Sequence, residues 1–192
     1  MRLLLIFVLL YAYAAIRYHV AKEQVDFIHF PFVLNKAIAW TAGTLFVLSI
    51  LPDKILQKFQ LGRRVVGVWG YRLAVVHILA SIILLCPELY PKFYTETTLN
   101  SAGWRHILFG ASSIALFTVP LWASWKNAPN DDYRYRFGRW GILMNLVHVA
   151  SIGASGWLKV DTWPWLMPPI TLLFVGFGVF VVILRYTRYS KN

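Results

Sequence analysis

The sequence predicts an all-α, polytopic membrane protein: a single domain over residues 1–192 that forms a six-transmembrane-helix bundle with both termini in the cytoplasm. Composition gives the first indication, because 58% of the residues are hydrophobic and 14% are charged, whereas a soluble domain has about 25% charged residues. The apolar residues form long blocks, and a helix needs about 20 such residues to cross a hydrocarbon core of about 30 Å. Trp and Tyr gather near the block ends, where amphipathic rings meet lipid headgroups.

The six apolar blocks define the predicted spans in chain order. The first follows Met1 and Arg2 and contains several small residues, a pattern that a cleavable signal peptide shares; cleavage would leave five spans. The second block ends at Pro52 and the third before Pro87, since proline does not continue a helix. The predicted spans are residues 3–16, 32–51, 65–85, 104–125, 138–157 and 165–184.

Basic residues are distributed unequally between the two sides of this bundle. Excess Lys and Arg mark the cytoplasmic side, and here they also meet anionic lipid headgroups, so the net charge of +11 indicates a lipid bilayer as partner and no nucleic acid. Five lie on the outer side: Arg17, Lys22, Lys92, Arg105 and Lys159. Twelve lie on the N-terminal side: Arg2, Lys54, Lys58, Arg63, Arg64, Lys126, Arg134, Arg136, Arg139, Arg185, Arg188 and Lys191.

Two histidines lie near the middle of predicted spans. His77 follows the start of span three by about 12 residues and His148 follows the start of span five by about 10, which places both roughly 15–18 Å from the cytoplasmic end. Spans three and five run in the same direction, so the two imidazoles share a depth. A facing pair of neutral imidazoles suits a six-coordinate heme iron. The alternative is that each ring hydrogen-bonds a neighbouring helix and packs there.

Other residues could complete a cofactor pocket. Span five is rich in Gly, Ala and Ser, which lets a flat macrocycle approach the backbone or another helix pack closely. Arg72, in span three, either snorkels to the interface or pairs with a heme propionate or with a flavin or quinone oxygen. His106, near the outer end of span four, is either interfacial, or it ligates a second metal centre or hydrogen-bonds a quinone. His19 and His29 fall in the first outer loop.

Several chemistries have little support. The sequence contains no P-loop and no Gly-rich dinucleotide fingerprint. Cys86 is the only cysteine, which excludes an internal disulfide and a Cys-based zinc site. No carboxylate lies inside a predicted span, so a proton-coupled transporter, a third possibility, lacks its usual relay group.

The stretch 61–80 (LGRRVVGVWGYRLAVVHILA) resembles the ferric reductase-like transmembrane domain family, and within it the heme-binding membrane subunit of bacterial methionine-sulfoxide reductase systems. Weaker similarity in 42–52 (AGTLFVLSILP) and 137–147 (FGRWGILMNLV) extends the resemblance over about residues 32–157. The residues that match the motif of the third helix at its spacing are Arg63, Arg64, Gly67, Trp69 and His77.

The chain departs from this family in its fifth helix. Met144 and Trp157 stand where the family usually has histidines, and His148 lies one turn after Met144. His77 alone therefore carries over from the motif, and His148 is its expected partner on grounds of depth. Met144 is either an axial thioether ligand or a packing residue. The small number of histidines argues against two stacked hemes.

The resemblance implies a membrane-embedded b-type cytochrome with one heme b, in a bacterial inner (plasma) membrane. Because the chain has no room for a flavin or nicotinamide domain, electrons are expected from a separate flavoprotein reductase, a bound flavin or membrane quinol. They are expected to reach an outer-side acceptor such as ferric iron or a periplasmic reductase. The alternative is a heme-free membrane scaffold or assembly subunit, in which His77 and His148 are packed polar groups.

Overall fold

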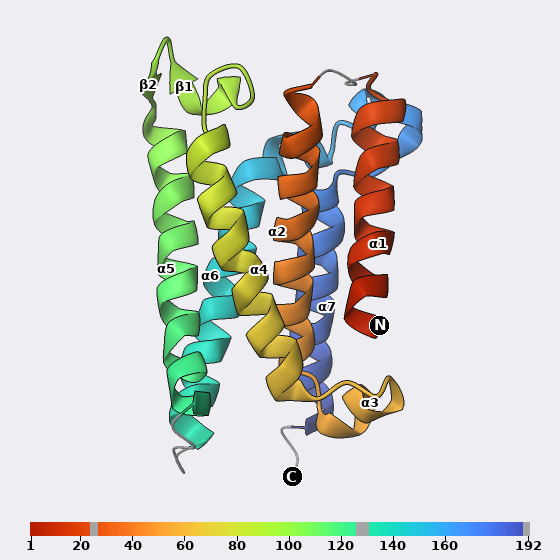
Figure 1. The fold of residues 1–192 in the computed structure, drawn as a ribbon, viewed down its shortest axis with the longest axis vertical. Helices are drawn as coiled ribbons and strands as arrows, with labels where there is room; N and C mark the ends of the chain where they lie inside the picture. Colours follow the sequence, from red (N-terminus) through yellow and green to blue (C-terminus); the bar gives the residue numbers. More distant parts are fainter. Residues whose placement is uncertain (24–26, 126–130, 190–192) are drawn as a thin grey trace.

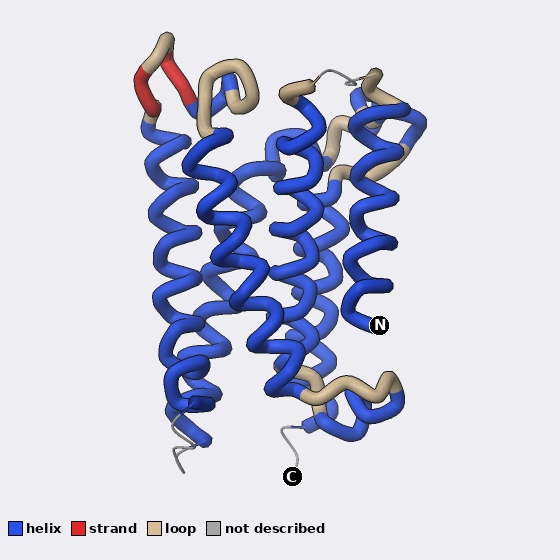
Figure 2. Tube along the Cα trace, viewed as in Figure 1, coloured by secondary structure: helices blue, strands red, loops and turns tan. Residues whose placement is uncertain are grey.

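The computed structural model describes residues 1–23, 27–125 and 131–189 and consists almost wholly of helices (Figure 1). Figure 2 shows that its strands form one short hairpin at one end of the bundle. The long helices are α1 (Arg2–Ala15), continued by a π-helical turn (Ile16–Val20), α2 (His29–Ser49), α4 (Arg63–Leu84), α5 (Ser101–Trp125), α6 (Asp131–Trp157) and α7 (Ile170–Tyr189). The shorter elements are α3 (Asp53–Lys58), β1 (Tyr94–Thr95), β2 (Thr98–Leu99) and 3₁₀ turns at Pro91–Phe93, Val160–Thr162 and Pro164–Leu166.

Successive long helices alternate in direction. In Figure 1, α1, α4 and α6 run away from the end of the bundle that carries α3, and α2, α5 and α7 run back toward it. The first residue of α1 and the last turn of α7 therefore point toward the α3 end. At the other end, β1 and β2 pair antiparallel, with Tyr94 opposite Leu99 and Thr95 opposite Thr98. The parallel course of α4 and α6 agrees with the predicted parity of spans three and five.

Five helices in the described part of the chain are long and apolar enough to cross a membrane: Arg2–Val20, α2, α4, α5 and Pro164–Arg185. The chain is thus an all-α helical protein with the character of a membrane protein. The predicted span five corresponds to α6, which is long enough but falls below the hydropathy of the other five. Its sequence combines charged residues near its start with Asn145, His148 and a run of Gly and Ser, which lowers its hydropathy.

The helix ends differ from the predicted ends because hydropathy detects apolar side chains rather than helical backbone. Five helices begin earlier than predicted, since the helix extends through residues that precede the apolar block: α1 at Arg2, α2 at His29, α4 at Arg63, α5 at Ser101 and α6 at Asp131. In contrast, α7 begins later, at Ile170. Pro168 and Pro169 precede it, and a proline cannot supply the N–H that a longer helix would need at that point.

Helix α2 is the centre of the bundle. Of its most apolar window, 56% is buried, against 11% in α1 and α5, because α1, α4, α6 and α7 all pack against it. The outer helices expose apolar side chains that suit lipid. Helix α2 packs most extensively on α4, as α5 does on α6. Gly70 permits the close contact between α4 and α2, since a Cβ at this position would lie 3.3 Å from the carbonyl oxygen of Ala42.

Two groups of buried residues hold the helices together. The larger joins α2, α5, α6 and α7, and at its centre the rings of Phe46 and Phe117 stack with centroids 3.7 Å apart. The smaller lies near the hairpin end and joins α1 and α2 to the loop before the hairpin; its members are Ala14, Phe32, Val33, Ala37 and Leu89. The polar residues described next lie on α2, α4, α5 and α6, beside these groups.

Candidate functional site

His77, on α4, is held by a polar network with the central helix. Its Nδ1 atom lies 2.8 Å from Oδ1 of Asn35 on α2, and the Asn35 Nδ2 group donates to Ser81 Oγ at 3.0 Å. Ser81 Oγ is also 3.3 Å from His77 Nδ1, one turn further along α4. Asn35 is only 2% exposed, so its amide has little access to solvent. Because Asn35 Oδ1 can only accept, His77 Nδ1 carries the proton and donates it.

His148, on α6, has the same protonation for a different reason. Its Nδ1 atom lies 3.0 Å from the backbone carbonyl oxygen of His106 on α5. A carbonyl oxygen accepts and never donates, so Nδ1 carries the proton here too. In both neutral rings the second nitrogen, Nε2, then carries a lone pair. Neither Nε2 makes a hydrogen bond with any residue that the structure describes.

A glycine makes the contact of His148 possible. Gly110 lies one turn after His106 on α5, and a Cβ at Gly110 would stand 2.9 Å from Cε1 and 3.1 Å from Nδ1 of His148. The imidazole thus crosses α5 where the helix lacks a side chain and reaches the carbonyl of the preceding turn. That carbonyl has two lone pairs, so it can accept from His148 as well as within the helix.

His106 belongs to the same group rather than to the surface. Its ring stacks on His148, with centroids 4.0 Å apart and planes 14° from parallel. The His106 ring also stacks on Phe93, with centroids 4.9 Å apart, and Phe93 stacks on Tyr90 at 5.7 Å. The Nδ1 atom of His106 is buried without a hydrogen-bond partner. Within the described chain, the histidine cluster therefore consists of Asn35, His77, Ser81, His106 and His148.

The two predicted histidines lie further from the starts of their helices than the sequence predicts, and about as far from the hairpin end. His77 is seven residues before the end of α4 and His148 is nine before the end of α6, or roughly 10–14 Å from those ends. His106 is five residues after the start of α5. Counted from these helix ends, the two predicted histidines share a depth within about two residues. The predicted distances of 15–18 Å were counted from residues 65 and 138. In the structure, the two helices begin earlier in the chain, at Arg63 and Asp131.

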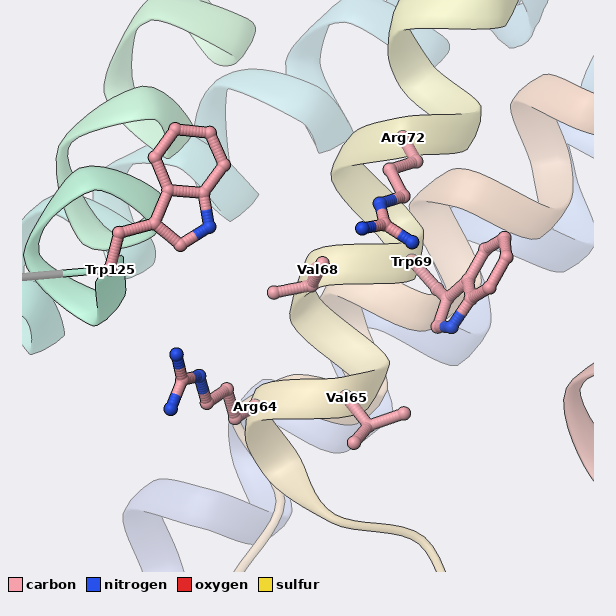
Figure 3. A pocket seen from close by; sticks show the side chains of 6 residues that line it. All are labelled: Arg64, Val65, Val68, Trp69, Arg72 and Trp125. Atoms are coloured by element: carbon pink, nitrogen blue, oxygen red, sulfur yellow. The ribbon is translucent and has the colours of Figure 1, made fainter.

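Arg72 lies apart from the histidines, in a different pocket of α4 (Figure 3). Its guanidinium lies over the ring of Trp69, with 5.1 Å between Cζ and the ring centroid. The pocket has a volume of about 290 Å³ and opens between α4 and the last residue of α5. We call it the arginine pocket; it is lined by Arg64, Val65, Val68, Trp69, Arg72 and Trp125.

The remaining predicted residues occupy less specific places. Met144 is half-buried on α6, one turn before His148. His19 stacks on Phe30 at 6.0 Å and His29 meets Phe32 edge-on at 6.1 Å, both near the first loop at the hairpin end. Among the described residues, no group of three or more His, Cys, Asp or Glu side chains could hold a metal ion. The described residues of the histidine cluster thus do not form a complete metal cage.

Sequence reasoning missed several members of this region. Asn35 lies in an apolar span and is polar, a signal that the sequence contained. Lys36, beside it, is an ionisable residue inside the same span; its Nζ lies 3.7 Å from the ring centroid of Phe32 and 4.0 Å from that of Tyr18. The role of Gly110 has no sequence signal, because it depends on how α6 faces α5.

Comparison of the sequence with models of protein families and with curated protein sequences finds no match.

Proposed function

We propose that this chain is a membrane-embedded b-type cytochrome of the ferric reductase-like kind. The observation that carries the proposal is the shared state of two imidazoles. His77 and His148 each donate from Nδ1 to a fixed oxygen, at 2.8 Å and 3.0 Å, and each keeps an Nε2 lone pair without a described donor. A metal-bound histidine commonly shows this arrangement, because the hydrogen bond of the second nitrogen fixes the tautomer and orients the ring.

Each residue of the cluster then has a definite task. His77 and His148 would hold one heme b through Nε2, and the heme would supply the one-electron chemistry when bound. Asn35 and the carbonyl of His106 hold the two rings and keep their protons on Nδ1. Gly110 leaves the space in which the His148 ring is oriented. His106 covers one face of that ring, and its stack with Phe93 and Tyr90 continues toward the hairpin end.

The membrane arrangement belongs to the proposal as well. We infer that α6 is a sixth span beside the five apolar helices, because it packs along α5 and α7 and carries one of the ligands. The excess of basic residues at the α3 end supports placing that end, and both termini, in the cytoplasm. Electrons would then enter from a cytoplasmic flavoprotein, a bound flavin or quinol. They would leave near the histidine cluster to ferric iron or a periplasmic reductase, in a bacterial inner membrane.

A reduced-minus-oxidised spectrum of the purified protein tests the proposal. Expression with added heme precursor should give a b-type α band in detergent extracts. His77→Ala and His148→Ala should each abolish or sharply reduce it, because each variant removes one of the two proposed ligands. His29→Ala is the matched control, since this ring lies outside the cluster, and should leave the band intact. Retention of heme in His148→Ala would move the second ligand to His106 or Met144.

The competing function is a heme-free membrane scaffold or assembly subunit. The contact that favours it is the His106–His148 stack at 4.0 Å, which gives both rings a packing role without a ligand. Absence of the α band in the wild-type protein after heme supplementation would sink the cytochrome proposal and leave this one. In that case His148→Ala should lower only the thermal stability of the protein.

A further inference from the structure

The arginine pocket lies on a single face of α4, at the end of the bundle opposite the histidine cluster. Five of its residues are spaced at positions i, i+1, i+4, i+5 and i+8 along α4, a spacing that places them on one side of a helix. Trp125, the last residue of α5, forms the opposite wall. This face is open: Val65 is 50% exposed, Trp69 44% and Trp125 65%. In a bilayer, lipid would therefore border the pocket.

Arg64 and Arg72 have no acidic partner among the described residues. Their neighbour Arg63 differs, because it pairs with Asp53 at 3.2 Å and donates to the carbonyl of Leu51 at 3.3 Å. The start of α4 adds to the positive potential, since its first turn contains no acidic residue and no side chain caps it, and the N-terminal end of a helix dipole is positive. Two unpaired guanidinium groups and this helix end together favour an anion.

The depth of Arg72 narrows the choice of anion. It lies eight residues beyond Arg64, or about 12 Å further along the helix axis. A charge at such a depth is costly unless the side chain snorkels outward or meets a counter-charge. Figure 3 shows the guanidinium of Arg72 directed back along α4 toward Val68, and that of Arg64 directed toward Trp125. Both groups thus border the same opening, at the level where Trp rings meet headgroups.

We propose that the arginine pocket binds the phosphate group of an anionic phospholipid. Arg64 and Arg72 would donate charge-assisted hydrogen bonds to the phosphate oxygens. Trp69 and Trp125 would flank the glycerol region, and Val65 and Val68 would contact the first carbons of an acyl chain. A headgroup with a net negative charge fits this lining, whereas a zwitterionic one brings its own cation. The inference does not rest on heme binding and holds for a cytochrome or a scaffold alike.

Native mass spectrometry of the detergent-purified protein tests this site. Titration with phosphatidylglycerol should show a bound lipid that phosphatidylcholine does not match. Each basic residue near an anionic lipid contributes about fivefold in affinity, so Arg64→Gln with Arg72→Gln should weaken phosphatidylglycerol binding about thirtyfold. The matched control removes two exposed charges at the other end, Arg105→Gln with Lys159→Gln, and should bind like the wild type. Thermal unfolding of both double variants in lipid-free detergent checks that they fold.

Three results would overturn the proposal. The first is a folded Arg64→Gln, Arg72→Gln variant that binds phosphatidylglycerol as tightly as the wild type. The second is an equal loss in the control pair, which would mean that net charge and not the pocket attracts the lipid. The third concerns the source of the phosphate: inorganic phosphate that binds the lipid-free protein and displaces phosphatidylglycerol would assign the pocket to a soluble phosphate instead.

Discussion

The histidine cluster and the arginine pocket both include residues of α4, but they satisfy the polar groups of this helix in opposite ways. At His77, the protein supplies a hydrogen-bond partner from two helices, and the neighbouring Asn35 is 2% exposed. At Arg72, the partner is an aromatic ring on the same helix, and the guanidinium faces an open pocket. The first site is fixed by internal contacts, whereas the second is complete only with a group from outside.

The two sites differ because neighbouring helices cover α4 unequally along its length. On the hairpin side, α4 carries the His77 and Ser81 face that meets α2. Toward the α3 end, the face with Val65 and Trp69 is exposed. A buried polar group requires a hydrogen-bond partner, so the histidine cluster must supply these partners from its own residues. Substitutions in the histidine cluster should therefore change stability first, and those in the arginine pocket should change lipid binding first.

The largest expected effect is that of filling the space at Gly110. In Gly110→Leu, the new side chain occupies the place of the His148 imidazole, which is held between the His106 ring and the His106 carbonyl. Overpacking of this kind costs about 3 kcal/mol, so the variant should unfold at a clearly lower temperature in detergent. In the proposed cytochrome it should also lose heme, as His148→Ala does.

Gly176→Ala is the matched control for that substitution. Gly176 is also helical, on α7, and an added Cβ there meets nothing within 4 Å. Because alanine favours helix over glycine by about 1 kcal/mol, this variant should be as stable as the wild type or slightly more so. An unchanged unfolding temperature in Gly110→Leu would mean that the α5–α6 contact is looser than the geometry indicates.

The sequence was sufficient to predict the long helices and to place His77 and His148 within them, because apolar blocks and the ionisable residues inside them are local signals. It was not sufficient to predict their partners. Asn35 reaches His77 only because α2 lies against α4, and His148 finds the carbonyl of His106 only because Gly110 faces α6. Such contacts depend on the rotation of each helix about its axis.

The next effect in size concerns the hydrogen bonds of the cluster. Asn35→Leu removes the acceptor of His77 Nδ1 and the donor to Ser81, and a buried polar group left without a partner costs about 2 kcal/mol. Thermal unfolding in detergent should report this loss. Within the proposed function, loss of such an outer partner should also weaken heme binding about tenfold or more. Asn35→Asp, which keeps an acceptor, should retain heme better than Asn35→Leu; equal loss in both would argue against a hydrogen-bonding role.

A pH dependence at the hairpin end gives a smaller effect. Burial, with a smaller contribution from Tyr18, raises the pKa of Tyr90 from 10.0 to about 12. The folded state therefore keeps the phenol proton where the unfolded state has lost it. This stabilisation is fully present below pH 10 and is lost between about pH 10 and 12. The unfolding temperature of the wild type should fall more steeply over that interval than that of Tyr90→Phe. Parallel curves would place the Tyr90 hydroxyl in water.

The smallest expected effect concerns two adjacent arginines at the start of α4. Arg63 and Arg64 begin α4, but only Arg63 has an acidic partner, and that pair is about half exposed, at 43% and 58%. An exposed ion pair contributes about 0.5 kcal/mol, so Arg63→Gln should lower the unfolding temperature slightly and leave phosphatidylglycerol binding almost unchanged. Arg64→Gln removes the same charge without breaking an internal contact. It should leave the lipid-free stability unchanged and weaken lipid binding about fivefold. If both variants lost lipid equally, the positive potential at the start of α4, and not the arginine pocket, would be the cause.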